Sequence, residues 1–320
     1  MTAKPIRVAV VGVGHVGTLH AQVYRKLAPQ AQLVAVCDAN TERARDIARQ
    51  FGCDVVSDAA ALIGHVDAAS VCVPTSFHHA VGRVLLAGGV HVLMEKPIAT
   101  SLREADELVA LAARRRLVLQ VGHIERFNAA IHAARRYLTH PRFIEAHRLS
   151  PYPFRGTDVS VILDVMVHDL DLVLAITKSQ PVRIDAVGVP VLSTSEDIAN
   201  VRLVFTSGCV ANLTASRVSD ESLRRLRVFQ EDCYLSIDYK HQTVEVARKM
   251  HGTIRRETLD VQRRPPLDDE LSAFLHAIRS RRRPPVPGEE AREVLALALA
   301  IERTMRRGRE SANSKRRVSK

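Results

Sequence analysis

The sequence has no tryptophan, only 4% aromatic residues and no apolar run long enough to cross a bilayer. Spanning the hydrocarbon core takes about 20 consecutive apolar residues, whereas the longest run in the second half of the chain, Val294 to Ile301, has eight. Single-stranded nucleic-acid binders stack bases on aromatic side chains placed among basic ones, and this pattern is missing. We therefore expect neither an integral membrane protein nor a nucleic-acid-binding protein.

Cysteine is also scarce, because the chain has five and none form a C-x-x-C pair or a zinc-finger spacing. An odd number of cysteines in a large chain without a signal peptide indicates reduced thiols in a cytosol. The basic N-terminus does precede an apolar stretch, Val8 to Val13, but this stretch is too short for a signal sequence. The sequence therefore predicts a cytoplasmic protein, and no cysteine spacing predicts a metal site.

The excess of positive charge lies mostly at the C-terminus. The formal net charge is +11, and the segment from Arg303 onward carries eight Lys or Arg against one acidic residue. We interpret residues 303–320 as a basic tail, poorly ordered and solvated. Weak contact with an anionic surface or polyanion is the alternative.

A length of 320 residues predicts two domains. In residues 1–122 short Val-rich runs alternate with helical patterns, and the runs are apolar on both faces, as in parallel strands covered by helices. We predict a doubly wound parallel α/β sheet here, with strands at Ile6–Val11, Leu33–Cys37, Ala69–Val73, His91–Met94 and Leu117–Val121.

After Gly122 the pattern changes to successive strands with turn signals between them, from Val182 to about Leu259. A regular helix is expected over Val161–Ile176, and two closing helices over Leu267–Arg281 and Gly288–Arg306. We predict an α+β domain with a mostly antiparallel open sheet over residues 123–302.

A glycine motif, Gly12-Val-Gly14-His-Val-Gly17, follows the first predicted strand and begins a helix. Such a turn lets a pyrophosphate approach the backbone and the helix N-terminus. Asp38 ends the second strand, where it can accept hydrogen bonds from ribose hydroxyls and repel a 2′-phosphate. The motif predicts NAD in preference to NADP; the alternative is a glycine-rich packing turn without a ligand.

The tripeptide Glu95-Lys96-Pro97 directly follows the predicted strand His91–Met94. In doubly wound sheets, ligands lie beyond the carboxyl ends of the strands. A lysine there could stabilise a developing alkoxide, or supply a proton if burial lowers its pKa. A solvated loop lysine is the alternative interpretation.

On the helix predicted for the second domain, Asp164 and His168 share a face because they are four residues apart. A carboxylate beside an imidazole orients the ring, and this suits a general base near neutral pH. Two alternatives remain: a metal site with Asp171, or a structural capping cluster.

Taken in order, these motifs resemble the Gfo/Idh/MocA oxidoreductase family: Gly12-x-Gly14-x-x-Gly17, Asp38, Pro74-Thr-x-x-His78, Glu95-Lys96-Pro97 and Asp164-x-x-x-His168. The resemblance implies an NAD-dependent dehydrogenase acting on CH–OH, with a catalytic group of Lys96, Asp164 and His168. The expected cofactor-binding residues are Gly12, Gly14, His15, Val16, Gly17, Asp38, Pro74, Thr75, His78, Glu95 and Lys96.

A narrower resemblance, to nucleotide-sugar dehydrogenases, rests on Gly122-His-Ile-Glu-Arg-Phe-Asn, Arg155-Gly-Thr-Asp and Leu163-Asp-Val-Met-Val-His-Asp-Leu-Asp. It departs from that subgroup at Ala129, where a proline is usual. It implies oxidation of the 3-hydroxyl of UDP-N-acetylglucosamine, for the amino sugar of bacterial lipid A, in a homo-oligomer. From their charge, Arg126, Arg148 and Arg155 are candidates for binding the substrate pyrophosphate. The alternatives are an inositol or other free-polyol dehydrogenase, and a non-catalytic dinucleotide-sensing regulator.

Overall fold

The computed structural model describes residues 4–152, 159–250 and 252–318. The chain forms two compact units, one of Met1–Ile124 with Pro265–Leu295 and one of Glu125–Arg264 with Ala296–Lys320. In the part of the chain that is described, no helix combines the length and apolar character needed to cross a bilayer.

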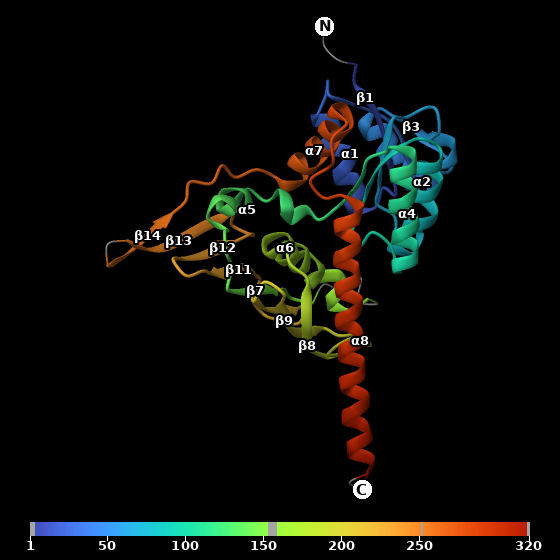
Figure 1. Cartoon of the computed structure of the whole chain (residues 1–320). Coiled ribbons are helices and arrows are strands. Elements are labelled where there is room, and N and C mark those ends of the chain that lie inside the picture. Colours follow the sequence, from blue (N-terminus) through green and yellow to red (C-terminus); the bar gives the residue numbers. More distant parts are fainter. Residues whose placement is uncertain (1–3, 153–158, 251, 319–320) are drawn as a thin grey trace. The chain divides into compact units, whose positions relative to one another are not determined.

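The first unit contains a six-stranded sheet in the order β3-β2-β1-β4-β5-β6, and all of its pairings are parallel (Figure 1). This order, with the chain starting in the centre and winding outward in both directions, is the predicted doubly wound fold. The strands are β1 Ile6–Val11, β2 Ala31–Cys37, β3 Asp54–Val56, β4 Ala68–Val71, β5 His91–Met94 and β6 Leu119–Val121.

These strands are connected by helices that bury their apolar faces on the sheet: α1 His15–Lys26, α2 Thr41–Phe51, α3 His78–Ala87 and α4 Leu102–Arg115. Helix α7, Pro266–Ser280, comes later in the chain and packs against α1. The N-terminus of α4 is capped as its sequence predicts, because Ser101 accepts a hydrogen bond from the Glu104 amide at 3.3 Å. The Glu104 carboxylate accepts in return from the amide of Thr100 at 3.1 Å, one residue earlier than the usual reciprocal bond.

The first unit also contains a segment that the sequence analysis assigned to the second domain. Helix α7 buries Leu271, Phe274 and Leu275 in the same core cluster as Val8 and Tyr24. Sequence order suggested that residues 265–295 close the second domain. The structure instead returns them to the first unit, because the apolar side of α7 completes the core around α1.

The second unit contains an eight-stranded sheet in the order β14-β13-β12-β11-β7-β10-β9-β8. Every pairing is antiparallel except the parallel one between β7 and β10, which gives the mostly antiparallel sheet that was predicted. The strands are β7 Phe143–Leu149, β8 Pro181–Val189, β9 Ile198–Phe205, β10 Val210–Ser216, β11 Leu223–Phe229, β12 Cys233–Asp238, β13 Thr243–Met250 and β14 Thr253–Thr258.

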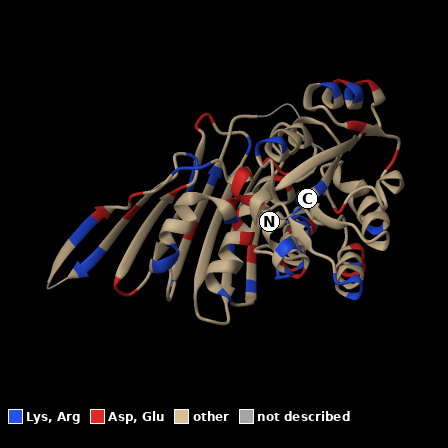
Figure 2. Ribbon diagram, turned by 90° about the horizontal axis from the view of Figure 1, so that it is seen from above, with Lys and Arg blue, Asp and Glu red and all other residues tan. Residues whose placement is uncertain are grey.

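Helices α5 Ala129–Ala134 and α6 Val167–Thr177 pack on this sheet and lie on the same side of it (Figure 1). The burial of β7 alternates residue by residue, with Ile144, Ala146 and Arg148 buried. At the β14 edge of this sheet, Lys and Arg gather on the β13–β14 hairpin (Figure 2).

Helix α8, Gly288–Val318, continues through most of the segment that was predicted to be a poorly ordered tail. Its first turns belong to the first unit and the rest to the second. Within the second unit, Arg309 pairs with Glu196, and Met305 is buried. The basic segment therefore begins as a packed helix, because Met305 is buried one turn beyond Ile301.

Candidate functional site

The glycine turn between β1 and α1 has the tight geometry that its spacing predicts. Gly12 has φ +85°, and a Cβ there would lie 2.7 Å from the Cys72 carbonyl carbon. A Cβ on Gly17 would lie 1.8 Å from the Gly12 oxygen, whereas one on Gly14 would meet nothing within 4 Å. Gly12 and Gly17 are therefore required by packing, and Gly14 leaves open space beside the turn.

The first turn of α1 faces this open space. Gly14 is the N-cap residue and supplies no side-chain cap, and the following residues, His15 and Val16, are exposed. The first amides of a helix have no partner within the helix and carry its positive dipole end. They can therefore bind an anionic group such as a diphosphate.

Asp38 lies at the carboxyl end of β2 and contacts the glycine turn directly. Its carboxylate accepts hydrogen bonds from the Val13 amide at 2.7 Å and the Asn40 amide at 2.8 Å. A carboxylate has about four acceptor sites, so it retains capacity for ribose hydroxyls. The sequence analysis missed Arg43, which donates to the Val13 oxygen and to the Thr18 hydroxyl. Its position three residues after Asn40, whose side chain caps α2, was the available signal.

Glu95 and Lys96 follow β5, so they lie at the same carboxyl edge of the sheet. Glu95 Oε1 is 3.2 Å from His20 Nε2, and its Oε2 accepts from the Lys96 amide at 3.3 Å. Burial raises the pKa of Glu95, but the hydrogen bond from His20 and the charges of His20 and Lys96 outweigh it and leave the pKa below its usual value. Glu95 is therefore a carboxylate held beside Lys96.

The side chain of His78 is buried between two loops. Its Nδ1 lies 2.8 Å from the Pro97 oxygen and its Nε2 3.0 Å from the Val73 oxygen. Desolvation lowers its pKa, although both carbonyls act in the opposite direction. It thus joins the loop after β4 to the loop after β5, while its neighbours Pro74 and Thr75 are more exposed. Both ring nitrogens already face backbone oxygens, and the expected contact of His78 with a cofactor stays a prediction.

In the second unit, Asp164 lies in a π-helical turn, Ile162–Met166, and His168 is the second residue of α6. The predicted regular helix is therefore widened at its start, a feature found frequently at functional sites. Both side chains are partly exposed, whereas Met166, Val167 and Leu170 are buried. Asp164 and His168 are therefore both accessible from solvent, and their pairing stays a prediction.

Arg148 is placed differently from the expectation that it meets a pyrophosphate. Its guanidinium makes two hydrogen bonds to Asp169, at 2.9 and 3.1 Å, and one to Glu125 at 2.9 Å. It also lies over the Tyr239 ring, with 5.3 Å to the centroid. These carboxylates keep the Arg148 pKa raised despite burial. Arg148 is 5% exposed and its charge is balanced by the carboxylates of Glu125 and Asp169. Through Asp169 it ties strand β7 to helix α6.

Arg126 is 3.5 Å from the Asp171 carboxylate. This pair holds Asp171 on the buried side of α6, and Asp171 does not join Asp164 and His168 among the groups of possible metal ligands found in the described residues. The alternative of a metal site at these three residues therefore has no geometric support. Arg155 lies outside the described residues.

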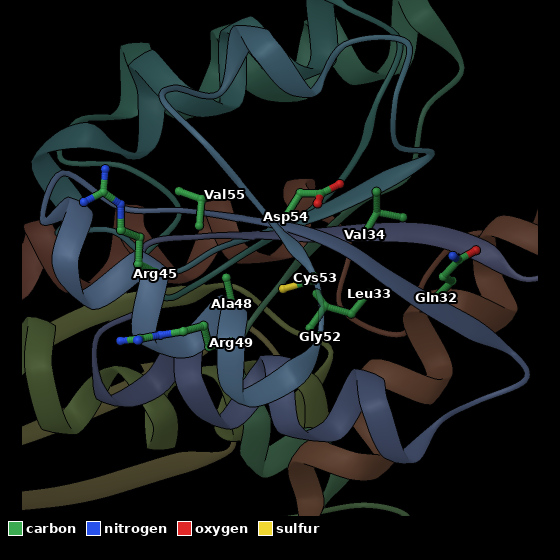
Figure 3. Close-up of a pocket in the computed structure, with 10 residues that line it drawn as sticks. All are labelled: Gln32, Leu33, Val34, Arg45, Ala48, Arg49, Gly52, Cys53, Asp54 and Val55. Carbon is green, nitrogen blue, oxygen red and sulfur yellow. The ribbon is translucent and has the colours of Figure 1, made fainter.

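A surface hollow of about 680 Å³ lies beside α2 and the starts of β2 and β3 (Figure 3). Its charged side chains are Arg45, Arg49 and Asp54. Because these strands begin at the hollow, it lies at the opposite edge of the sheet from Gly12 and Glu95. It is not part of the candidate site.

The residues of the first unit fit a dinucleotide. The open space at Gly14, the uncapped first turn of α1 and the carboxylate of Asp38 provide what a diphosphate and an adenosine ribose need. Lys96 and Glu95 lie beyond β5, where doubly wound sheets bind the rest of such a ligand.

Comparison with known proteins agrees with this geometry. Residues 6–123 match the GFO_IDH_MocA family, described as an oxidoreductase family with an NAD-binding Rossmann fold, and residues 121–236 match the GFO/IDH/MocA C-terminal domain. The chain is 41% identical to the UDP-N-acetylglucosamine 3-dehydrogenase of Acidithiobacillus ferrooxidans over 303 residues, 92% of this chain and 96% of that protein.

A solved structure of that enzyme superposes with a TM-score of 0.90 at 40% identity, over 94% of this chain and 98% of that one. A more distant relative, the myo-inositol 2-dehydrogenase of Thermotoga maritima, is 26% identical over 94% of this chain and 96% of its own. The matched domains span both units, and the chain belongs to the Gfo/Idh/MocA family of NAD-binding oxidoreductases.

Proposed function

We propose that this protein oxidises the 3-hydroxyl of UDP-N-acetylglucosamine to a ketone with NAD. The observation that carries the proposal is the 41% identity, across 92% of the chain, to an enzyme of that name. The glycine turn, the open space at Gly14 and the Asp38 carboxylate support the choice of cofactor.

In this proposal, the catalytic group consists of Lys96, Asp164 and His168. When bound, NAD supplies a hydride acceptor for the hydrogen on the carbinol carbon. His168 removes the hydroxyl proton, and Asp164 orients its ring and stabilises the imidazolium. The Lys96 ammonium stabilises the developing alkoxide. Their partial exposure supports these roles, because each side chain is reachable by a substrate.

The substrate diphosphate is assigned to Arg126 and Arg155. Arg126 is 16% exposed and pairs with Asp171 on α6, so its side chain contacts the helix that carries His168. Arg148 is assigned to positioning, because its charge is already compensated by Glu125 and Asp169.

The test follows reduced-cofactor absorbance with UDP-N-acetylglucosamine and NAD. The loss of a general base lowers turnover by about 10²–10⁴-fold, so His168→Ala should lose kcat by that factor and retain NADH affinity. His132→Ala, at an exposed histidine of α5, is the matched control and should behave as the parent chain. A His168→Ala variant with full turnover would refute the assignment.

The second candidate is oxidation of a free polyol, favoured by the full-length match to a myo-inositol 2-dehydrogenase. Running the same assay with myo-inositol separates the two, since the better substrate has the higher kcat/KM. A chain that binds NADH and turns over neither compound would instead be a dinucleotide-sensing regulator.

We also propose a cytoplasmic homo-oligomer, a dimer or tetramer, that acts in lipid A amino-sugar synthesis. The five free cysteines support a reducing compartment. The product ketone would be consumed by an amino-group transfer reaction. Light scattering on the purified chain measures the subunit number, and a monomer at working concentration would contradict the oligomer.

A further inference from the structure

Three side chains from different parts of the first unit bring metal-binding atoms together. His20 comes from α1, Cys72 follows β4 and Glu95 follows β5; one ligand atom of each lies within 4.8 Å of the others. His20 Nε2 and Glu95 Oε1 are already 3.2 Å apart. An imidazole nitrogen, a thiol sulfur and a carboxylate oxygen are the three donor types that Zn²⁺ uses.

The imidazole of His20 is already oriented for such a ligand role. Its Nδ1 lies 3.0 Å from the Ser70 hydroxyl, which in turn lies 2.8 Å from the Tyr24 hydroxyl. A histidine that binds a metal through one nitrogen usually donates the other N–H to an oriented oxygen. Ser70 and Tyr24 therefore supply the supporting shell, and the His20 ring needs no rotation to present Nε2.

The electrostatic surroundings favour a cation. The carboxyl groups of Glu95 and Glu270 both act electrostatically on Cys72. Their negative charges would attract a divalent ion. On binding, the S–H bond breaks, its proton leaves to solvent and the thiolate sulfur bonds to the metal. His20 binds as its Nδ1–H tautomer, so the Nε2 proton shared with Glu95 leaves to solvent and Nδ1 carries the ring proton toward the Ser70 hydroxyl.

The cluster adjoins the glycine turn. A Cβ on Gly12 would lie 2.7 Å from the Cys72 carbonyl carbon, and one on Gly17 would lie 3.3 Å from the Cys72 Cβ. The Glu95 side chain is 19% exposed and Cys72 is partly exposed, so an ion has access from the carboxyl edge of the sheet.

We propose that His20, Cys72 and Glu95 form an inhibitory Zn²⁺ site, and that the ion and the dinucleotide exclude each other. Zinc would replace the His20–Glu95 hydrogen bond with coordination and draw Glu95 away from the Lys96 amide. Three protein ligands leave a fourth position for water. The inhibitory half of this proposal rests on the proposed dinucleotide site; the metal-binding half does not.

Calorimetric titration of the chelator-treated protein with ZnCl₂ tests the metal site. We expect one Zn²⁺ per chain. Cys72→Ala and Cys72→Ser should each weaken binding by about a hundredfold or more, and Ser70→Ala by about 10–100-fold, as for other supporting residues. Cys53→Ala, at another partly exposed free cysteine, is the matched control and should bind zinc as the parent does.

Cobalt provides a direct signature of the thiolate. Co²⁺ in place of Zn²⁺ should give an ultraviolet thiolate-to-metal charge-transfer band that is present in Cys53→Ala and absent in both Cys72 variants. Circular dichroism of each variant identifies a folding defect. Stoichiometric zinc binding that persists in the folded Cys72 variants, or no zinc binding by the parent, would overturn the site.

Fluorescence titration with NADH, with and without zinc, tests the inhibition. Zinc should raise the apparent Kd for NADH in proportion to its concentration in the parent and in Cys53→Ala, and not in Cys72→Ser. Zinc binding without effect on NADH would refute the inhibitory half. Failure of NADH to bind in the absence of zinc would refute the proposed function and leave the calorimetric result to decide the metal site.

Discussion

The two units present their candidate site residues by different physical means. In the first, the backbone shapes the site: a glycine turn, an uncapped helix end and a short hydrogen-bond chain through His20 to Glu95. In the second, buried ion pairs hold the elements, with Arg148 between Glu125 and Asp169. The first site depends on glycines that carry no side chain at the turn. The second depends on buried charges that neutralise each other.

This difference predicts different vulnerabilities. A backbone site fails when an atom is added, because close-packed backbone has no room to yield. An ion-pair site fails when one partner is removed, because the remaining charge is buried and uncompensated.

The largest effect is expected for Gly17→Ala. Its Cβ would lie 1.8 Å from the Gly12 oxygen, so β1 and α1 must separate, at a cost of about 4 kcal/mol or more in unfolding free energy. Gly14→Ala is the matched control, since its Cβ meets nothing within 4 Å. It should fold with nearly parental stability and weaken NADH binding. Urea denaturation and NADH fluorescence measure both; equal stability of the two variants would contradict this account.

Next in size is Arg148→Met. It leaves Glu125 and Asp169 buried without their cation, which should cost about 3–5 kcal/mol in urea denaturation. Arg183→Met removes one partner of an exposed pair with Asp185 and should cost less than about 1 kcal/mol. Equal losses of unfolding free energy in the two variants would show that burial does not make the Arg148 ion pairs more stabilising than an exposed pair.

A smaller, pH-dependent effect is expected at Asp197. Burial raises its pKa, but hydrogen bonds from Ser193, Leu192 and Arg217 outweigh this and hold it below the ordinary value. A carboxyl whose folded pKa is depressed adds stability above its unfolded pKa of about 3.9, and this stability is lost as pH falls below that value. Asp197→Asn should therefore be less stable at pH 7 and lose less stability between pH 5 and pH 3 than the parent. A parental pH slope in this variant would contradict the assignment.

The smallest effect is expected at Asp38. Its carboxylate would repel a 2′-phosphate, so Asp38→Asn should reduce the preference for NAD over NADP by about tenfold, or about 1.4 kcal/mol. Asp46→Asn, on the exposed side of α2, serves as the charge-matched control. Fluorescence titration with both reduced cofactors gives the ratio; an unchanged ratio would assign selectivity to Arg43 instead.

Much of the first unit could be predicted from sequence because its patterns are local. Val-rich runs covered by helices gave the parallel sheet, and the spacing from Gly12 to Asp38 gave the turn and the carboxylate that contacts it. The packing between segments far apart in the chain could not be predicted, because it leaves no local pattern in the sequence. The packing of α7 against α1, which buries Phe274 in the core of the first unit, could not be read from a helix that follows more than a hundred residues of another unit.

In the second unit the mostly antiparallel strands were predictable from alternation and turn signals. The pairing of Asp164 with His168 on one helical face stays a prediction. The π-helical turn and the burial of Arg148 were not predictable. A basic residue on an alternating strand has the same pattern whether it meets a substrate or a buried carboxylate. Only the positions of the Glu125 and Asp169 carboxylates show that Arg148 is a buried, paired residue and not a residue that binds substrate.

By itself, the sequence determined where the chain turns, which faces are apolar and which residues follow the strands, because these depend on backbone preferences and periodicity over a few positions. Only tertiary structure decided which charges are compensated and which polar atoms meet, as in His20 with Glu95 and Arg148 with Asp169. Those encounters depend on distances between segments far apart in the chain. The energies of burial and charge pairing change steeply with such distances.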